Sequence, residues 1–93
     1  MKAEAKIEKY LVDQVRLKGG FSRKYISPGV RGVPDRIIFL HGHVAFVEVK
    51  SSRGKLSGLQ VREIHRMIDA GAKVYVVSSE GEVDKCLNML LHI

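Results

Sequence analysis

The chain has 93 residues, which is enough for one small domain with a single core and too few for two. Hydrophobic residues make up 45% of the sequence and charged residues 28%, a globular balance that excludes the disordered and membrane-embedded classes. Sixteen Lys and Arg against ten Asp and Glu give a formal charge of +6. This charge favours a polyanionic partner such as nucleic acid, although a merely soluble basic surface accounts for the composition equally well.

The sequence carries no sign of export or membrane insertion. No apolar run approaches the roughly 20 residues needed to cross a bilayer, and no apolar signal core follows the first residues. The single cysteine, Cys86, excludes a disulfide framework and a cysteine-rich zinc site. We therefore expect an intracellular, cytoplasmic protein without a membrane partner, in which Cys86 serves packing.

The first predicted element is an amphipathic helix over residues 3–18. Its apolar residues recur at every fourth position among charged ones: Ile7, Leu11 and Val15. Two glycines at positions 19 and 20 supply the left-handed stop that helices favour. Residues 21–27 then read as a short strand.

Two strands over residues 35–40 and 44–50 form the centre of the predicted fold. Both runs are rich in β-branched and aromatic residues, and only His41-Gly42-His43 separates them, which is hairpin spacing. Breaker clusters around Pro28 and Pro34 frame an irregular loop before the hairpin. The strands are apolar on both faces, so we expect helices to cover both sides of the sheet.

A helix, a strand and a final helix are predicted after the hairpin. Ser57 and Gln60 match a capping box, and the helix that they begin ends at Gly71. Residues 73–78 read as a strand. The last apolar residues follow helical spacing: Val83, Cys86, Leu87, Leu90 and Leu91. The chain is thus predicted to be a single α/β domain over residues 1–93, with the order α-β-β-β-α-β-α and a mixed sheet flanked by helices.

Three charged residues of the hairpin are candidates for a common site. Glu48 and Lys50 are two residues apart, so both side chains point to one face of their strand. A two-residue turn would pair Asp35 with either of them on that face, whereas a three-residue loop without a bulge would put Asp35 on the far face. A salt-bridge cluster is the plainer interpretation of such a group. However, a charged side chain is rarely found in an otherwise buried strand unless it has a function.

The residues around these charges resemble a known nuclease signature. Gly32-Val33-Pro34-Asp35 followed by Val47-Glu48-Val49-Lys50 is similar to the motif of the PD-(D/E)xK superfamily, and the predicted element order resembles its restriction-endonuclease-like core. With Glu8 on the first helix and Gln60 opening the second, nearly the whole chain resembles the virus-type replication-repair nuclease (VRR-NUC) domain. The signature positions show no departure from this pattern.

The resemblance implies a deoxyribonuclease that depends on Mg²⁺ or Mn²⁺. Asp35 and Glu48 would be metal ligands together with the carbonyl of Val49, and Lys50 would lie beside the attacking water. Bound Mg²⁺ neutralises charge on the phosphoryl oxygens and activates water, which phosphodiester hydrolysis needs near neutral pH. Lys50 would orient that water or stabilise the developing charge.

Two further residues are implied in the site by the same resemblance. Glu8 would reach the metal directly or through water, or would simply be a charged residue on the surface of its helix. Glu4 on the same helix is a competing candidate for the metal contact. Gln60 would contact the substrate or order the site, and this role is compatible with its place in the capping box.

Six basic residues on strand edges and loops are candidates for phosphate contacts, although a solvated charge is the plainer role for each singly: Arg23, Lys24, Arg31, Arg36, Arg53 and Lys55. The resemblance implies branched duplex DNA as substrate, as for a four-way junction resolvase. We also expect a homodimer, because self-association could cover apolar surface that a domain of this size leaves exposed. A monomeric flap or nonspecific nuclease and a non-catalytic basic DNA-binding module remain as alternatives.

Overall fold

The computed structural model describes residues 2–92, in which the predicted order of three helices and four strands is confirmed. Element bounds differ from the predicted ones by one to three residues, most at the first strand, which ends at Lys24. Among these residues, no helix combines the length and apolar character needed to cross a membrane. The elements are α1 (Ala3–Leu17), β1 (Phe21–Lys24), β2 (Arg36–Leu40), β3 (His43–Val49), α2 (Gly58–Asp69), β4 (Val74–Val77) and α3 (Glu80–Leu91).

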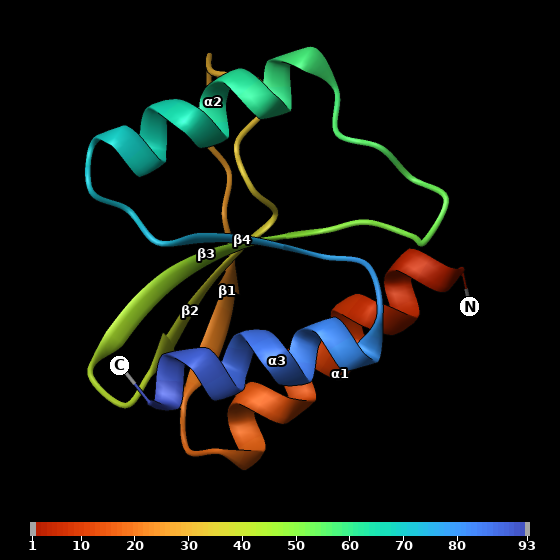
Figure 1. The fold of residues 1–93 in the computed structure, drawn as a ribbon, viewed down its shortest axis with the longest axis vertical. Coiled ribbons are helices and arrows are strands. Elements are labelled where there is room, and N and C mark those ends of the chain that lie inside the picture. Colours follow the sequence, from red (N-terminus) through yellow and green to blue (C-terminus); the bar gives the residue numbers. More distant parts are fainter. Residues whose placement is uncertain (1, 93) are drawn as a thin grey trace.

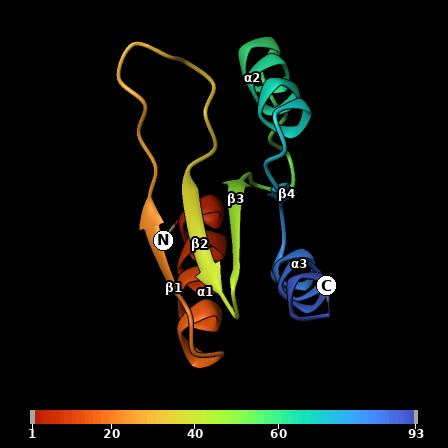
Figure 2. The same cartoon turned by 90° about the vertical axis from the view of Figure 1, so that its left-hand side faces the viewer.

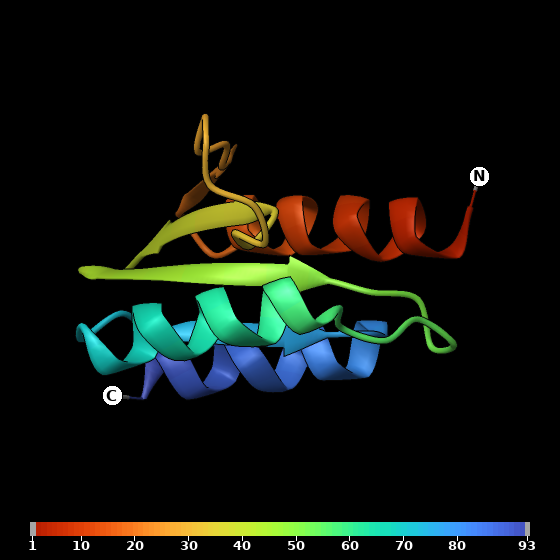
Figure 3. The same cartoon turned by 90° about the horizontal axis from the view of Figure 1, so that it is seen from above.

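The four strands form one mixed sheet in the order β1-β2-β3-β4. The first three strands pair antiparallel, while β4 pairs parallel to β3. A parallel neighbour cannot be reached by a tight turn, and α2 provides the crossover between β3 and β4. Helices α1 and α3 lie together, apart from α2 (Figure 1), and β3 runs through the middle of the molecule between α1 and α2 (Figure 3).

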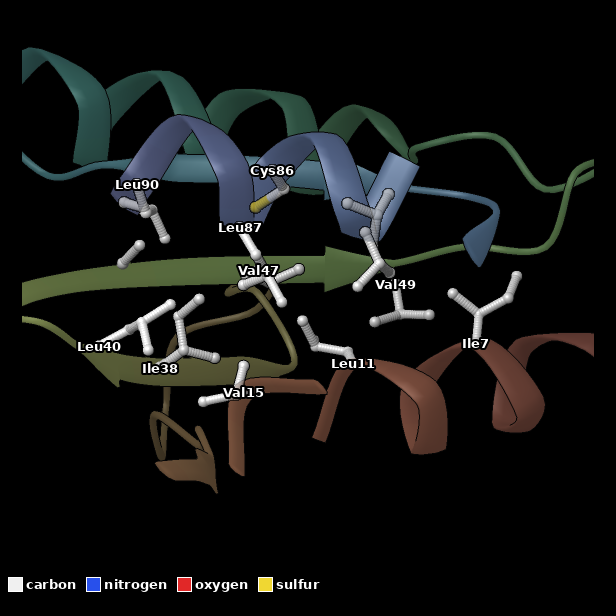
Figure 4. Packing of buried hydrophobic residues seen from close by; sticks show 13 residues of the cluster. Ile7, Leu11, Val15, Ile38, Leu40, Val47, Val49, Cys86, Leu87 and Leu90 are labelled. Carbon is white, nitrogen blue, oxygen red and sulfur yellow. The ribbon is translucent and has the colours of Figure 1, made fainter. Parts of the chain in front are cut away.

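The main core lies between one face of the sheet and the helices α1 and α3 (Figure 4). Strand alternation places Ile38 and Val47 on this face, and both are fully buried. Tyr10 donates a hydrogen bond to Asp84 across 2.8 Å and joins the two helices. Of the predicted apolar helix residues, Leu91 is half-buried and packs against this core. The others are buried in it, as predicted: Ile7, Leu11, Val15, Val83, Cys86, Leu87 and Leu90.

Cys86 is 3% exposed, which agrees with the packing role expected for it. Burial raises the pKa of its thiol to about 11, so the reactive thiolate is scarce at neutral pH.

The opposite face of the sheet is covered unevenly. Helix α2 packs on β4, with Ile64 as its buried residue. No helix stands in front of β1, β2 and β3 in Figure 2, where α1 lies behind the strands and α2 to one side. Helices flank both sides of the sheet as predicted. Within residues 2–92, α2 is the helix on this side, and because it packs on β4 it leaves the face of β1, β2 and β3 without a helix.

Candidate active site

The hairpin turn decides whether the candidate side chains meet. Leu40 pairs with His43, so the connection is the two-residue turn His41-Gly42. Both turn residues have positive φ, 52° at His41 and 82° at Gly42, as a type I′ turn requires. The register continues to Arg36 opposite Val47, which puts Asp35 beside Glu48 at the next step. The convergence predicted for a two-residue turn is confirmed.

Asp35 is held from both sides just before β2 begins. Its backbone carbonyl accepts a hydrogen bond from Tyr25 N at 2.8 Å, extending the pairing of β1 with β2. Its carboxylate Oδ2 accepts from the backbone N–H of Val49 at 3.2 Å. The side chain therefore lies against the end of β3, with the Val49 backbone beside it.

Glu48 is the buried charged residue of this group. It is 1% exposed, and its Oε2 accepts from Gln60 Nε2 at 2.8 Å and lies 3.5 Å from Lys50 Nζ. Its Oε1 is also buried and has no hydrogen-bond partner among residues 2–92. Burial raises the pKa of Glu48 above its ordinary value, the negative charge of Asp35 raises it further, and Lys50 acts in the opposite direction.

The orientation of the Gln60 amide follows from the capping box of α2. Ser57 Oγ accepts from Gln60 N at 3.1 Å, and Gln60 Oε1 accepts from Ser57 N at 2.9 Å. Because the amide oxygen is committed to the helix start, the amide NH₂ group faces Glu48. The capping role predicted for Gln60 is confirmed, and the same side chain orders a carboxylate of the candidate site.

The loop before Asp35 packs directly on the first turn of α2. Gly32 has φ +87°, and a Cβ added there would lie 2.5 Å from Leu59 O and 3.0 Å from Gln60 N. These are backbone atoms that cannot move aside without shifting the helix. Only glycine permits this approach, which joins the loop of Asp35 to the helix that carries Gln60.

The residues present fit a divalent cation. Two neighbouring carboxylates and an unpartnered buried oxygen on Glu48 form a donor set of hard oxygens, which is the chemistry that Mg²⁺ and Mn²⁺ prefer. Within residues 2–92, no cluster of three or more acidic, histidine or cysteine side chains is arranged to hold a metal ion. Mg²⁺ commonly retains several waters and uses few protein carboxylates, so a pair is sufficient.

Glu8 makes its contacts with basic residues. Its Oε2 accepts from Arg36 Nε at 2.8 Å and lies 3.7 Å from Lys24 Nζ. The Arg36 side chain is 17% exposed, so this pair is partly buried and ties α1 to the strand that follows Asp35. The contact of Glu8 with a metal stays a prediction, and its competitor Glu4 is exposed.

The predicted phosphate-binding residues fall into three groups. Lys24 and Arg36 already face Glu8. Arg31 is exposed in the loop that ends at Asp35. Arg53 and Lys55 are exposed in the loop that begins at Lys50. Arg23 lies over the ring of Phe21 at 4.8 Å and donates to Ser22 O.

Sequence reasoning missed the structural effect of two residues, Gly32 and Ser57, on the site. Gly32 was part of the signature, but its approach to Leu59 depends on how the loop meets α2. Ser57 was recognised as a cap without its consequence for Glu48. A signal was present, since a capping-box glutamine follows the strand end that carries Glu48 and Lys50.

Comparisons with known proteins agree with this geometry. The chain is 45% identical over 78 residues to "Putative nuclease p44" of Acyrthosiphon pisum secondary endosymbiont phage 1, covering 83% of this chain and 84% of that protein. A solved structure described as "VRR_NUC domain" is similar with a TM-score of 0.88 and 36% identity, covering 95% of this chain and 97% of that one. No family model matches.

The element order and the mixed sheet follow the fold of that structure. The identity and the nearly complete coverage in both comparisons are enough to assign the family. The chain belongs to the VRR-NUC family.

Proposed function

We propose that this chain is a metal-dependent DNA endonuclease whose active site contains Asp35, Glu48 and Lys50. The observation that carries the proposal is the buried carboxylate of Glu48, which has one unpartnered oxygen and lies beside a second carboxylate. Such a pair is costly without a compensating cation. The family membership and the nuclease name of the phage relative support the same function.

Each residue has a defined task in phosphodiester hydrolysis. Asp35, Glu48 and the carbonyl of Val49 would hold Mg²⁺ or Mn²⁺, which would supply Lewis acidity and activate water when bound. Lys50, whose Nζ is 3.5 Å from Glu48 Oε2, orients the attacking water or stabilises charge on the phosphoryl oxygens. Gln60 keeps Glu48 oriented through its 2.8 Å hydrogen bond.

Branched duplex DNA and a homodimer belong to the same proposal. A two-fold dimer presents two copies of the site in one symmetric relation, and a four-way junction offers two equivalent strands related by a similar axis. The formal charge of +6 and the exposed Arg31, Arg53 and Lys55 suit a polyanionic substrate.

Cleavage assays on labelled linear, flap and four-way DNA test the proposal. We expect nicking in Mg²⁺ and Mn²⁺, little in Ca²⁺ and none in EDTA, because Ca²⁺ takes looser geometry and acidifies water less. Asp35→Asn, Glu48→Gln and Lys50→Ala should abolish cleavage and keep DNA binding, since affinity comes mainly from phosphate contacts. Wild-type rates in any of the three variants would contradict the site.

Light scattering at micromolar concentration tests the dimer. A monomer that cuts flaps faster than junctions would favour the flap-nuclease alternative. Binding to DNA without nicking under any metal condition would favour the non-catalytic module, in which the acidic pair is structural.

A further inference from the structure

All three phenylalanines of the chain lie on the sheet face that points away from the main core. Phe21 on β1 stacks on Phe39 of β2, with ring centroids 4.7 Å apart. The rings of Phe46 on β3 and Tyr25 meet at an edge-type angle, with centroids 5.1 Å apart. Aromatic rings are the largest source of buried area that a small domain has. In this protein the three phenylalanine rings are outside the core, whereas Tyr10 and Tyr75 pack against it.

Phe21, Phe39, Phe46 and Val44 define this aromatic face, and no helix stands in front of its three strands in Figure 2. Phe39 and Phe46 are half-buried. Phe21 is 48% exposed and Val44 is 47% exposed. Contiguous exposed apolar side chains on a small protein mark a binding surface.

The catalytic candidates stand on the same face. Strand alternation puts Phe46, Glu48 and Lys50 on one side of β3, and Asp35 faces Glu48 across the hairpin. Phe39 is four residues from Asp35, a separation of about 13 Å along the strand at about 3.3 Å per residue. That length corresponds to about four stacked nucleotides at roughly 3.4 Å each.

Away from the carboxylates of Asp35 and Glu48, the charge on this face is cationic. Among the described strand residues, Arg23 is the charged side chain on the part of this face that lies away from the site. Its guanidinium group lies over the Phe21 ring. Aromatic rings combined with arginine bind single-stranded nucleic acid, because every base has a face that can stack. A paired duplex would instead lay charged phosphates against apolar rings.

We propose that the aromatic face binds unpaired nucleotides of the substrate, in the strand that extends from the cleaved phosphate toward the hairpin turn. This inference rests on the proposed nuclease function and adds a feature of its branched substrate: bases that are unpaired close to the cut, at an opened branch point or in a flap. A second copy of the chain, bound through its own aromatic face, fits this face less well. Arg23 of each copy would then lie against a surface whose carboxylates are those of the site alone.

Fluorescence anisotropy in EDTA measures the effect without cleavage. The probes are a blunt duplex, the same duplex with an unpaired arm of about six nucleotides, and that arm alone. Phe21→Leu keeps apolar area but removes the flat ring, so we expect about tenfold weaker binding of the two probes with unpaired bases and unchanged binding of the blunt duplex. Phe21→Trp should restore binding.

Met89→Ala is the matched control, because Met89 is 58% exposed on α3 and lies against β4, at the opposite edge of the sheet from β1. It should leave all three affinities unchanged. Equal losses for Phe21→Leu on all probes, no loss on any, or dissociation of an oligomer by this variant would overturn the inference, and the last result would make the face a subunit interface.

Photocrosslinking tests the same point with the unmodified protein. An arm carrying 5-iododeoxyuridine should crosslink to Phe21 or Phe39, and crosslinks confined to the loops would contradict the inference. Its failure is distinguishable from failure of the proposed function: a wild-type chain that binds no DNA or never nicks it refutes the nuclease, whereas nicking without aromatic crosslinks refutes only the aromatic face.

Discussion

The Gln60 amide joins the start of α2 to Glu48, donating from Nε2 to the carboxylate Oε2 across 2.8 Å. Its Oε1 accepts the backbone N–H of Ser57 at 2.9 Å, so one amide satisfies the helix start and orients a carboxylate of the site. The second oxygen of Glu48 is left buried without a partner. A local helix-start motif thus controls which oxygen of the carboxylate is available to a cation.

Replacing the cap of α2 tests this link. Ser57→Ala keeps the backbone N–H that Gln60 Oε1 accepts from, but it removes the 3.1 Å hydrogen bond between Ser57 Oγ and Gln60 N. The variant should cost about 1 kcal/mol of stability and, by loosening the helix start that carries Gln60, weaken Mn²⁺ binding and cleavage about tenfold. Ser79→Ala is the matched control, since Ser79 caps α3 with the same 3.1 Å hydrogen bond, to Glu82 N, and α3 does not carry a site residue. Calorimetric Mn²⁺ titration and urea unfolding measure both effects. Equal losses of metal affinity in the two variants would contradict the link.

The contact between the Asp35 loop and α2 can be tested at its glycine. In Gly32→Ala the new Cβ would meet Leu59 O at 2.5 Å, so the loop must move away from the helix and cleavage should fall by at least tenfold. Gly29→Ala in the same loop has a comparable φ of +81° with no atom within 4 Å of the new Cβ. Both carry the backbone penalty of about 1 to 2 kcal/mol, but only the first displaces the site. Similar cleavage by both variants would argue against this contact.

The raised pKa of Glu48 predicts how stability depends on pH. An acid with a raised pKa keeps its proton to higher pH in the folded chain than in the unfolded one, so stability falls as pH rises above the ordinary value of 4.5 through the folded pKa. Glu48→Gln should remove this loss and match or exceed the wild type at neutral pH in EDTA. Urea unfolding across a pH series of both proteins measures it, and a variant that is less stable at neutral pH would refute it.

Two arginines near the site should behave differently. Arg36→Ala leaves Glu8 without its 2.8 Å partner in a partly buried pair and should lower the free energy of unfolding by about 1 to 3 kcal/mol. Arg53→Ala removes an exposed loop charge, so stability should hold while the salt dependence of DNA binding decreases by about one phosphate contact. Urea unfolding and anisotropy at several salt concentrations separate the two. The reverse assignment of effects would show that Arg36 is the phosphate ligand.

Local patterns in the sequence were enough to predict the seven elements and their order. Ile7, Leu11 and Val15 repeat at a helical period, and Ser57 with Gln60 marks a helix start through contacts between near neighbours. The two-residue spacing of Glu48 and Lys50 likewise places both on one face of a strand, because that period is a property of the strand alone.

The position of Asp35 depended on the third dimension. The three letters His41-Gly42-His43 permit a two-residue or a three-residue turn, and the difference moves every side chain of the strand to the other face. The choice depends on how the paired strands twist and pack. In the folded chain both residues of the two-residue turn, His41 and Gly42, have positive φ.

The partner of Glu8 and the open aromatic face were likewise decided only by tertiary packing. Arg36 is 28 residues from Glu8, and nothing in the local sequence marks them as neighbours. Alternation showed that the hairpin strands are apolar on both faces, but not which face would remain bare. That followed from where the crossover placed α2, over β4 and away from Phe21 and Phe39, because a single helix covers only the strands that it packs against.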